Sequence, residues 1–314
     1  TSLIHTKQQQ AQQLAQQQQQ QEQQELQQHL KLDALGVQLR SNMLYSEGDH
    51  THYGQLLDAN RIAPLWERIR TVSKYEERLA AVQEFNSTHR YKKRGIYMIP
   101  TKYGISFTAS FLNQGGALVH IYHVDGSVLV SHGGIEMGQG LHTKVAQCAA
   151  TALGVPLSKV FISETSTDKV PNSSPTAASV GSDLYGAAVV DACRQLNERL
   201  EPIRRELQGG DAERVIEWST LVHTAYMKQI NLSAQGFYHT PNLWMDWKRS
   251  QGRPFAYFTY GTACSEVEID TLTGDMHVIQ TDIVMDVGDS LNPSIDIGQI
   301  EGAFTQGLGL FTLE

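Results

Sequence analysis

The sequence predicts an α+β protein in which mixed sheets are flanked by helices and candidate ligand loops stand at strand-to-helix junctions. Three observations support this prediction. Apolar runs of strand length alternate with stretches that have helical spacing. Turn dipeptides that contain glycine separate neighbouring strands. Three times along the chain, a predicted strand leads through a loop of small residues to the start of a helix.

Composition limits the classes of partner. A chain of 314 residues can bury a substantial core. A net charge of -8 offers no basic surface for a nucleic-acid backbone, so we expect no nucleic-acid partner. No apolar run is long enough to cross a bilayer, so we expect no membrane partner. Cys148, Cys193 and Cys264 lie unevenly spaced in apolar runs, which favours buried thiols and a cytoplasmic location.

The chain divides into two segments that differ in composition. Residues 1–29 form a low-complexity segment rich in glutamine, with too few apolar residues to pack a core. Residues 30–314 have the composition of a folded domain. Within them, residues 58–86 place apolar side chains three or four apart behind Pro64, which predicts an amphipathic helix or a pair of helices. The chain begins without Met and ends in mid-pattern, so we expect it to be part of a longer polypeptide.

From Gly95 onward the pattern is that of strands and helices in turn. Asp125-Gly126 joins two apolar runs and predicts a tight hairpin, because this dipeptide accommodates positive φ angles. After the loop SHGGIEMGQG, residues 141–154 have the spacing and the closing glycine of a helix. Residues 160–164 (VFISE) read as a strand that leads to a second loop and a long helix. Further on, a hairpin that turns at Thr273-Gly274-Asp275 leads to a third loop and a glycine-rich helix.

The loop SHGGIEMGQG, residues 131–140, has the composition of an anion-binding turn. Backbone N–H groups and the positive end of a helix dipole together bind anions, above all phosphate. A standard nucleotide site is disfavoured, because no Lys-Ser/Thr pair follows the loop and no third glycine completes a dinucleotide motif. Gln139 lies between two glycines and can donate and accept at once, as recognition of a heterocycle requires. The alternative is a tight turn with a solvent-facing glutamine, and both interpretations stay open.

Two further segments are candidates for ligand contact. Consecutive small residues over 174–182 would let a bulky ligand approach the main chain, although close helix packing uses small residues equally well. Gln299 and Gln306 lie seven apart and therefore share one face of a predicted helix. The histidines show no zinc-ligand spacing. We expect Glu136 to orient its loop through backbone N–H groups rather than to act as a base.

The loops closely resemble those of a known family, and the resemblance runs almost continuously from about Leu30 to the end of the chain. The family is the molybdenum hydroxylases of the xanthine dehydrogenase/oxidase type, and the part that is similar is the second part of their molybdenum-cofactor-binding domain. The resemblance implies that residues 30–314 are a partial molybdopterin-binding domain whose C-terminal end lies beyond Glu314. It is carried by GISFTASFLNQGGALVHIY, GSVLVSHGGIEMGQGLHTKVAQ, VFISETSTDKVPNSSPTAAS, YFTYGTACSEVEIDTLTGD and TDIVMDVGDSLNPSIDIGQIEGAFTQGLGLFTLE.

The resemblance implies roles for particular residues. Ala178 would lie with its backbone next to molybdenum, and the family usually has serine where this chain has Gly181. Residues that match the purine pocket are Phe107, Thr108 and Ala177. Residues that match contacts to the molybdopterin are Gln139, Ala178, Ser179, Val180, Gly181 and Gln299.

The resemblance also implies an activity and the partners that the activity needs. The reaction would be oxidation of hypoxanthine and xanthine to urate, with electrons passing through 2Fe-2S clusters and FAD in other domains of the polypeptide to NAD+ or oxygen. A homodimer is implied, in the cytoplasm or in peroxisomes. The family's catalytic glutamate would lie beyond Glu314, so we assign no catalytic residue here. The alternatives are an aldehyde oxidase-like enzyme with a different pocket and an inactive truncated module.

Overall fold

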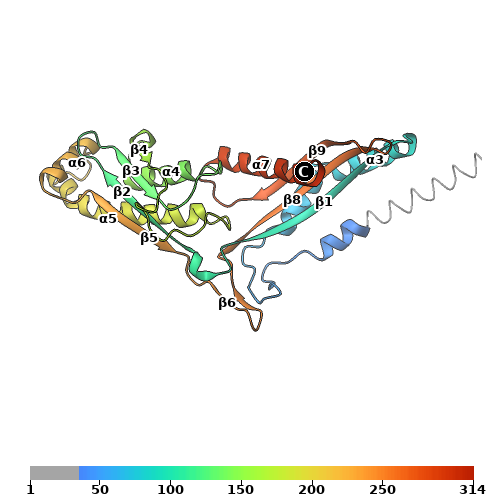
Figure 1. The fold of residues 1–314 in the computed structure, drawn as a ribbon, viewed down its shortest axis with the longest axis horizontal. Coiled ribbons are helices and arrows are strands. Elements are labelled where there is room, and N and C mark those ends of the chain that lie inside the picture. The colour runs from blue at the N-terminus through green and yellow to red at the C-terminus, as the bar shows by residue number, and fades with distance from the viewer. Residues whose placement is uncertain (1–34) are drawn as a thin grey trace, which may run out of the picture. The chain divides into compact units, whose positions relative to one another are not determined.

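The computed structural model describes residues 35–314, and the glutamine-rich segment 1–29 lies outside them (Figure 1). The chain divides into two compact units. The first contains the described residues up to His50, together with Leu56–Tyr103 and Thr259–Asp286. The second contains Thr51–Gln55, Gly104–Phe258 and Val287–Glu314.

The first unit packs two helices against a three-stranded sheet. The predicted helix pair is confirmed as α2 (Ile62–Val72) and α3 (Tyr75–Thr88), separated by Lys74 in a left-handed conformation with φ 50°. The sheet has the order β1-β8-β9. Its strands are β1 (Lys92–Ile105), β8 (Tyr257–Asp270) and β9 (Met276–Asp286).

The core of the first unit is small and apolar, with an ion network beside it. The buried residues that form it are Trp66, Ile69, Tyr75, Met98 and Cys264. Arg78 of α3 donates to Glu266 at 2.8 Å and to Asp282 at 2.7 Å. These bonds join α3 to both strands of the β8–β9 hairpin, which was predicted from its turn.

The second unit is built on a four-stranded sheet of order β4-β3-β2-β5. Antiparallel β2–β3 and β2–β5 pairs and a parallel β3–β4 pair make it mixed, as predicted. The hairpin at Asp125-Gly126 is confirmed, since Ile121 pairs with Val128. The strands are β2 (Gln114–Ile121), β3 (Val128–His132), β4 (Val160–Ile162) and β5 (Ser233–His239).

Helices pack on this sheet and bury most of the apolar core. The longest is α5 (Gly181–Gln208), which lies so close to β5 that a Cβ on Gly236 would be 1.9 Å from the carbonyl oxygen of Ala188. The core draws on α4, α5, α6 and the strands. The remaining elements are α4 (Leu141–Leu153), α6 (Trp218–Met227), α7 (Pro293–Thr312), the 3-10 turns η1 (Ser110–Leu112) and η2 (Leu157–Lys159), and the hairpin β6 (Trp244–Asp246) with β7 (Gln251–Arg253).

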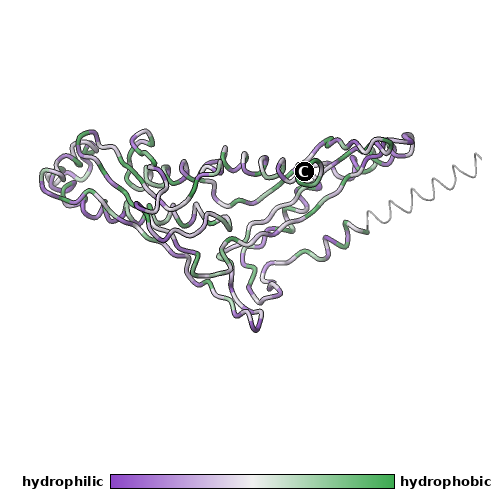
Figure 2. Tube along the Cα trace, in the orientation of Figure 1, coloured by the Kyte–Doolittle hydropathy of each residue, from purple (hydrophilic) through white to green (hydrophobic). Residues whose placement is uncertain are grey.

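The predicted α+β class is confirmed, and so are its three strand–loop–helix junctions. They are β3 to α4, β4 to α5 and β9 to α7. Hydrophobic and hydrophilic residues are interspersed along the described part of the chain (Figure 2). Among residues 35–314, no helix combines the length and the apolar character that crossing a bilayer requires. Within the same range, all three cysteines are free thiols.

Candidate functional site

The loop between β3 and α4 is shaped by close packing around its glycines. A Cβ on Gly134 would lie 2.5 Å from Leu141 and 2.6 Å from Tyr185, so no larger residue fits without a shift. The N–H of Gly134 donates to Nδ1 of His132 at 3.1 Å. His132 is 1% exposed, and burial lowers its pKa to about 4, with nearby His142 adding to the effect. His132 is therefore a neutral acceptor that holds the first turn of the loop.

Glu136 organises the second half of this loop. Its carboxylate accepts the N–H groups of Gly138 and Gly140 at 2.9 Å each and that of His142 at 2.8 Å. Burial alone would raise the pKa of Glu136, but these backbone hydrogen bonds lower it below its ordinary value. The expectation that Glu136 orients the loop is confirmed. Glu136 therefore occupies the N–H groups of Gly138, Gly140 and His142, which corrects the prediction that these three groups near Gln139 hold an anion.

Gln139 is locked into the same loop by its amide. Its Nε2 donates to the carbonyl of Ile135 at 2.8 Å, and its Oε1 accepts the N–H of Met137 at 2.5 Å. A primary amide has two N–H groups and two acceptor lone pairs. One of each therefore stays available to a ligand while the side chain is held in place.

The second loop ends at the open N-terminus of α5. The N–H of Ile135 donates to Oγ1 of Thr176 at 2.9 Å, which joins the two loops. Ala178 and Ser179 have φ angles of 55° and 57°, so two consecutive residues are left-handed. The backbone N–H groups of the first helical turn, from Gly181 to Asp183, meet no acceptor within the described part of the chain. The positive end of a 28-residue helix is thus available to an anion.

The third loop brings α7 to the start of α4. Asn292 caps α7 by accepting the N–H of Ile295 at 3.3 Å. Lys144 of α4 forms an ion pair with Asp296 of α7 at 3.1 Å. Gln299, one turn further along α7, donates to the carbonyl of Gly138 at 3.4 Å. Residues about 150 positions apart in sequence are joined in this way.

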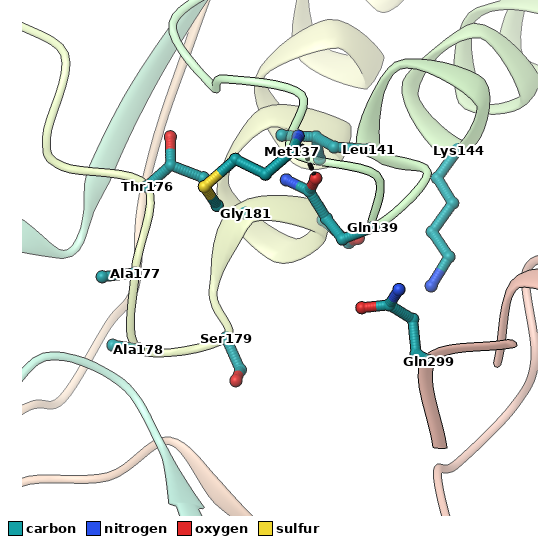
Figure 3. A pocket seen from close by; sticks show the side chains of 11 residues that line it. Met137, Gln139, Leu141, Lys144, Thr176, Ala177, Ala178, Ser179, Gly181 and Gln299 are labelled. Atoms are coloured by element: carbon teal, nitrogen blue, oxygen red, sulfur yellow. Dashed lines mark hydrogen bonds between the residues drawn. The ribbon is translucent and has the colours of Figure 1, made fainter. Parts of the chain in front are cut away.

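The first two loops, the starts of α4 and α5, and Gln299 of α7 surround one pocket of about 390 Å³. Figure 3 shows Lys144 and Gln299 reaching toward each other on one side, opposite the segment that carries Ala177 and Ala178. The convergence predicted for Gln139, the Ala178–Gly181 segment and Gln299 is confirmed as geometry. The lining residues are Met137, Gln139, Leu141, Lys144, Thr176, Ala177, Ala178, Ser179, Gly181, Ser182 and Gln299.

Several predicted residues lie beside the pocket rather than in its wall. Val180 is 3% exposed and belongs to an apolar cluster with Ile105 and Leu184, so its side chain contributes packing. Phe107 packs partly buried against this cluster, as Ala178 does. Thr108 is exposed and does not line the pocket. Gln306, the other glutamine of the predicted helix face, is also exposed and lies outside the pocket lining.

Sequence reasoning missed Lys144, which contributes the ammonium group of the pocket wall. A phosphate-binding nucleotide motif has lysine followed by serine or threonine, whereas Lys144 follows Thr143. Its position four residues after Gly140, one turn into α4, was the available signal. Among residues 35–314, no group of three or more His, Cys, Asp or Glu side chains could hold a metal ion. A metal in this pocket would therefore depend on a ligand other than a cluster of these side chains.

Comparison with known proteins gives one family. Residues 68–314 match the family described as molybdopterin cofactor-binding domain. The chain is 56% identical over 277 residues to xanthine dehydrogenase/oxidase of Gallus gallus, covering 88% of this chain and 20% of that protein. It is 58% identical over 269 residues to xanthine dehydrogenase of Oryza sativa subsp. japonica, covering 86% of this chain and 19% of that protein. The chain thus spans about a fifth of the length of these curated relatives.

Solved structures share the fold. The aldehyde oxidoreductase from Desulfovibrio desulfuricans superposes with a TM-score of 0.72 at 27% identity, covering 87% of this chain and 28% of that one. Quinoline 2-oxidoreductase from Pseudomonas putida 86 has a TM-score of 0.71 at 23% identity, covering 87% of this chain and 37% of that one. The similarity to quinoline 2-oxidoreductase shows a shared fold and nothing more.

Proposed function

Because the chain belongs to the molybdopterin cofactor-binding domain family, we propose that it forms the cofactor pocket of a molybdenum hydroxylase that oxidises hypoxanthine and xanthine to urate. One observation carries the proposal. The first two loops matched to the cofactor and the helix that follows the third loop surround a single pocket, and each contributes hydrogen-bonding groups to it. The alternative in which these loops serve only as tight turns does not account for their convergence.

The residues present fit the group that the family implies. A volume of about 390 Å³ falls in the range of small-molecule sites, roughly 300–1,000 Å³. The open N-terminus of α5 suits a phosphate, and the amides of Gln139 and Gln299 suit the donor and acceptor edge of a pterin. Lys144 adds a cation to the same wall. When bound, the molybdenum cofactor supplies a redox centre that hydroxylates an electrophilic ring carbon.

Small and aromatic residues of the chain would orient the substrate. Ala177 and Ala178 leave room beside the main chain, and in this proposal Ala178 is the residue nearest the metal. Phe107, packed in the same cluster as Ala178, offers an aromatic surface to a planar purine. Thr108 follows it with an exposed hydroxyl that can donate or accept. No residue of this chain is assigned as the catalytic base.

We propose that the rest of the reaction depends on other parts of the polypeptide. The curated relatives are about five times as long as the matched region, which leaves room for further domains. We assign FAD and 2Fe-2S clusters to those domains, with NAD+ or oxygen as the final acceptor. A homodimer in the cytoplasm, or in peroxisomes, completes the proposal. Three free thiols are compatible with a reducing compartment.

An aldehyde substrate is the second candidate. It is favoured by the similarity to an aldehyde oxidoreductase, which reaches 27% identity. The purine proposal has the stronger support, because the proteins named xanthine dehydrogenase are 56% and 58% identical to this chain.

The test is turnover and metal analysis of the complete polypeptide that carries this chain. We expect stoichiometric molybdenum and a higher kcat/KM for xanthine than for benzaldehyde. The reverse preference would support the aldehyde proposal. Absence of molybdenum after expression in a host that makes the cofactor would support an inactive module.

A further inference from the structure

We propose that Asn113 is a positioning residue that governs substrate selection by fixing Phe107 and Thr108 beside the Ala177–Ala178 wall of the pocket. The inference rests on the proposed function. Asn113 does not line the pocket, and it is not among the residues proposed to contact the substrate.

The side chain of Asn113 binds both backbone polar groups of Phe107. Its Oδ1 accepts the N–H of Phe107 at 2.8 Å, and its Nδ2 donates to the carbonyl of Phe107 at 2.8 Å. Nδ2 also donates to the carbonyl of Ser110 at 3.3 Å. Asn113 is 1% exposed, so these bonds are shielded from water. The pair imitates one rung of a β-ladder, with a side chain in place of the second strand.

Asn113 is itself held by the sheet. It directly precedes β2, and its carbonyl accepts the N–H of Thr240 at 3.0 Å, just beyond the end of β5. Its own N–H donates to the carbonyl of Ser110 at 3.1 Å. The sheet therefore fixes the position of Asn113, and the Asn113 side chain in turn fixes the segment that carries Phe107.

The fixed segment lies next to the pocket wall. Phe107 packs against the cluster formed by Ile105, Val180 and Leu184, and Ala178 packs against the same cluster. Ala178 also lines the pocket. A shift of Phe107 would therefore change the space beside Ala178, where the purine is proposed to bind. Only asparagine has both the acceptor and the donor at this reach, since aspartate lacks the N–H groups and glutamine is one methylene longer.

The experiment compares variants of the complete enzyme. Asn113→Asp keeps the shape and the acceptor but places an acid against the carbonyl of Phe107, and Asn113→Ala removes both groups. Gln114→Ala is the matched control, because Gln114, the first residue of β2, donates to the carbonyl of Phe111 at 2.6 Å without reaching Phe107. Phe107→Leu serves as the reference for a direct loss of the aromatic surface.

We expect KM for xanthine to rise on the order of tenfold in both Asn113 variants, equivalent to about 1.4 kcal/mol, with kcat changed far less. Preference should shift from xanthine toward benzaldehyde. Hydrogen exchange of residues 106–112 should become faster, while molybdenum content stays that of the unaltered enzyme. A purely structural role would lower the metal content without separating KM from kcat.

The outcomes distinguish the inference from the proposed function. If Phe107→Leu raises KM for xanthine while both Asn113 variants behave like Gln114→Ala, the inference is overturned and the proposed function stands. If Asn113→Asp does not fold, Asn113→Ala decides by the same comparison. If the unaltered enzyme fails to oxidise xanthine, the proposed function fails, and substrate selection by Asn113 fails with it.

Discussion

Nζ of Lys144 lies 3.1 Å from Oδ1 of Asp296, and this ion pair joins α4 to the first turn of α7 beside the pocket. Each side chain is 16% exposed, so the pair is largely shielded from water. Ser290 also donates to the carboxylate of Asp296. The hydrogen bond from Ser290 and, after it, the pairing with Lys144 lower the pKa of Asp296, although burial acts in the opposite direction. Gln299 follows one turn later, so the pair sets where its amide enters the pocket.

We expect Asp296→Asn to loosen the start of α7. Loss of a partly buried charged hydrogen bond costs about 1–3 kcal/mol, and the uncompensated ammonium of Lys144 adds to that effect. Hydrogen exchange of residues 293–300 in the complete polypeptide should become faster, and cofactor retention should fall. Glu301→Gln is the control, because Glu301 is exposed on the same helix and its side chain meets no partner within residues 35–314. Equal exchange rates in Asp296→Asn and Glu301→Gln would contradict the conclusion that the Lys144–Asp296 pair holds the start of α7.

The pH dependence of this pair follows from the sign of the shift. Because the folded state lowers the pKa of Asp296, the stabilisation is fully present above the ordinary value of 3.8. This stabilisation is lost as the pH falls through the lower pKa that Asp296 has in the folded state. The difference between unaltered protein and Asp296→Asn should therefore disappear in acid, as judged by the exchange rate of the same residues.

The three hydrogen bonds accepted by Glu136 give a second prediction. Glu136→Gln removes the charge and one of the two acceptor oxygens, so at least one N–H among Gly138, Gly140 and His142 loses its partner. We expect exchange of these amides to rise on the order of tenfold, which corresponds to about 1.4 kcal/mol of local stability. Glu164→Gln is the control, since the Glu164 side chain is 77% exposed in its pair with Lys169. An unchanged loop in Glu136→Gln would show that packing alone holds it.

Much of the local structure could be predicted from short-range signals. The helix expected over 141–154 is observed as α4, ending at Leu153 with Gly154 left-handed at φ 70°. Such boundaries depend on neighbouring residues, which a sequence displays directly. The strand expected over 160–164 is shorter, because β4 ends at Ile162 and only the N–H of Ser163 continues the pairing, to Val130.

The site was predictable only in part, for a physical reason. The small residues of 174–182 and the glutamines were recognisable from the sequence as candidates for ligand contact. That they meet at one pocket depends on contacts between distant parts of the chain. Lys144 was missed because its partner Asp296 is 152 positions away. The role of Asn113 was hidden too, since its bonds to Phe107 depend on how a loop closes. The sequence predicted ligand-binding N–H groups near Gln139 and in the Ala178–Gly181 turn, but it did not show how many of the former Glu136 occupies.

His132 gives a prediction about acid stability. Burial, with a smaller contribution from His142, lowers its pKa from 6.5 to about 4. In the unfolded chain this imidazole binds a proton near pH 6.5, whereas in the folded chain it stays neutral until about pH 4. Stability should therefore decline as the pH falls from 6.5, by up to about 3 kcal/mol at pH 4.

The variant that tests this is His132→Asn, whose Oδ1 can still accept the N–H of Gly134. The variant should lose the part of the pH dependence between 6.5 and 4 that His132 causes. Denaturant midpoints at intervals across this range are the measurement. A slope identical to that of the unaltered protein would assign the acid sensitivity to other groups.

Gly181 and Gly140 give opposite expectations for adding a side chain near the pocket. A Cβ on Gly181 would lie 3.4 and 3.5 Å from the methyl groups of Leu141, which is ordinary van der Waals contact. Gly181→Ser should therefore be tolerated, with a gain of at most about 0.5 kcal/mol from helix propensity. Because Gly181 lines the pocket, the new hydroxyl would add a donor there, and we expect cofactor retention to rise.

Gly140→Ala is the counterpart at the other helix start. Gly140 has a φ of 76°, and a Cβ there would lie 2.5 Å from Cδ1 of Ile295, so the Ile295 side chain or α7 must shift to admit it. We expect destabilisation by about 1–3 kcal/mol and a loss of bound molybdenum, because α7 carries Gln299 into the pocket. Melting temperature and metal content of the complete polypeptide measure both effects. If both variants retained the cofactor equally, the contact between Gly140 and Ile295 would have no part in forming the pocket.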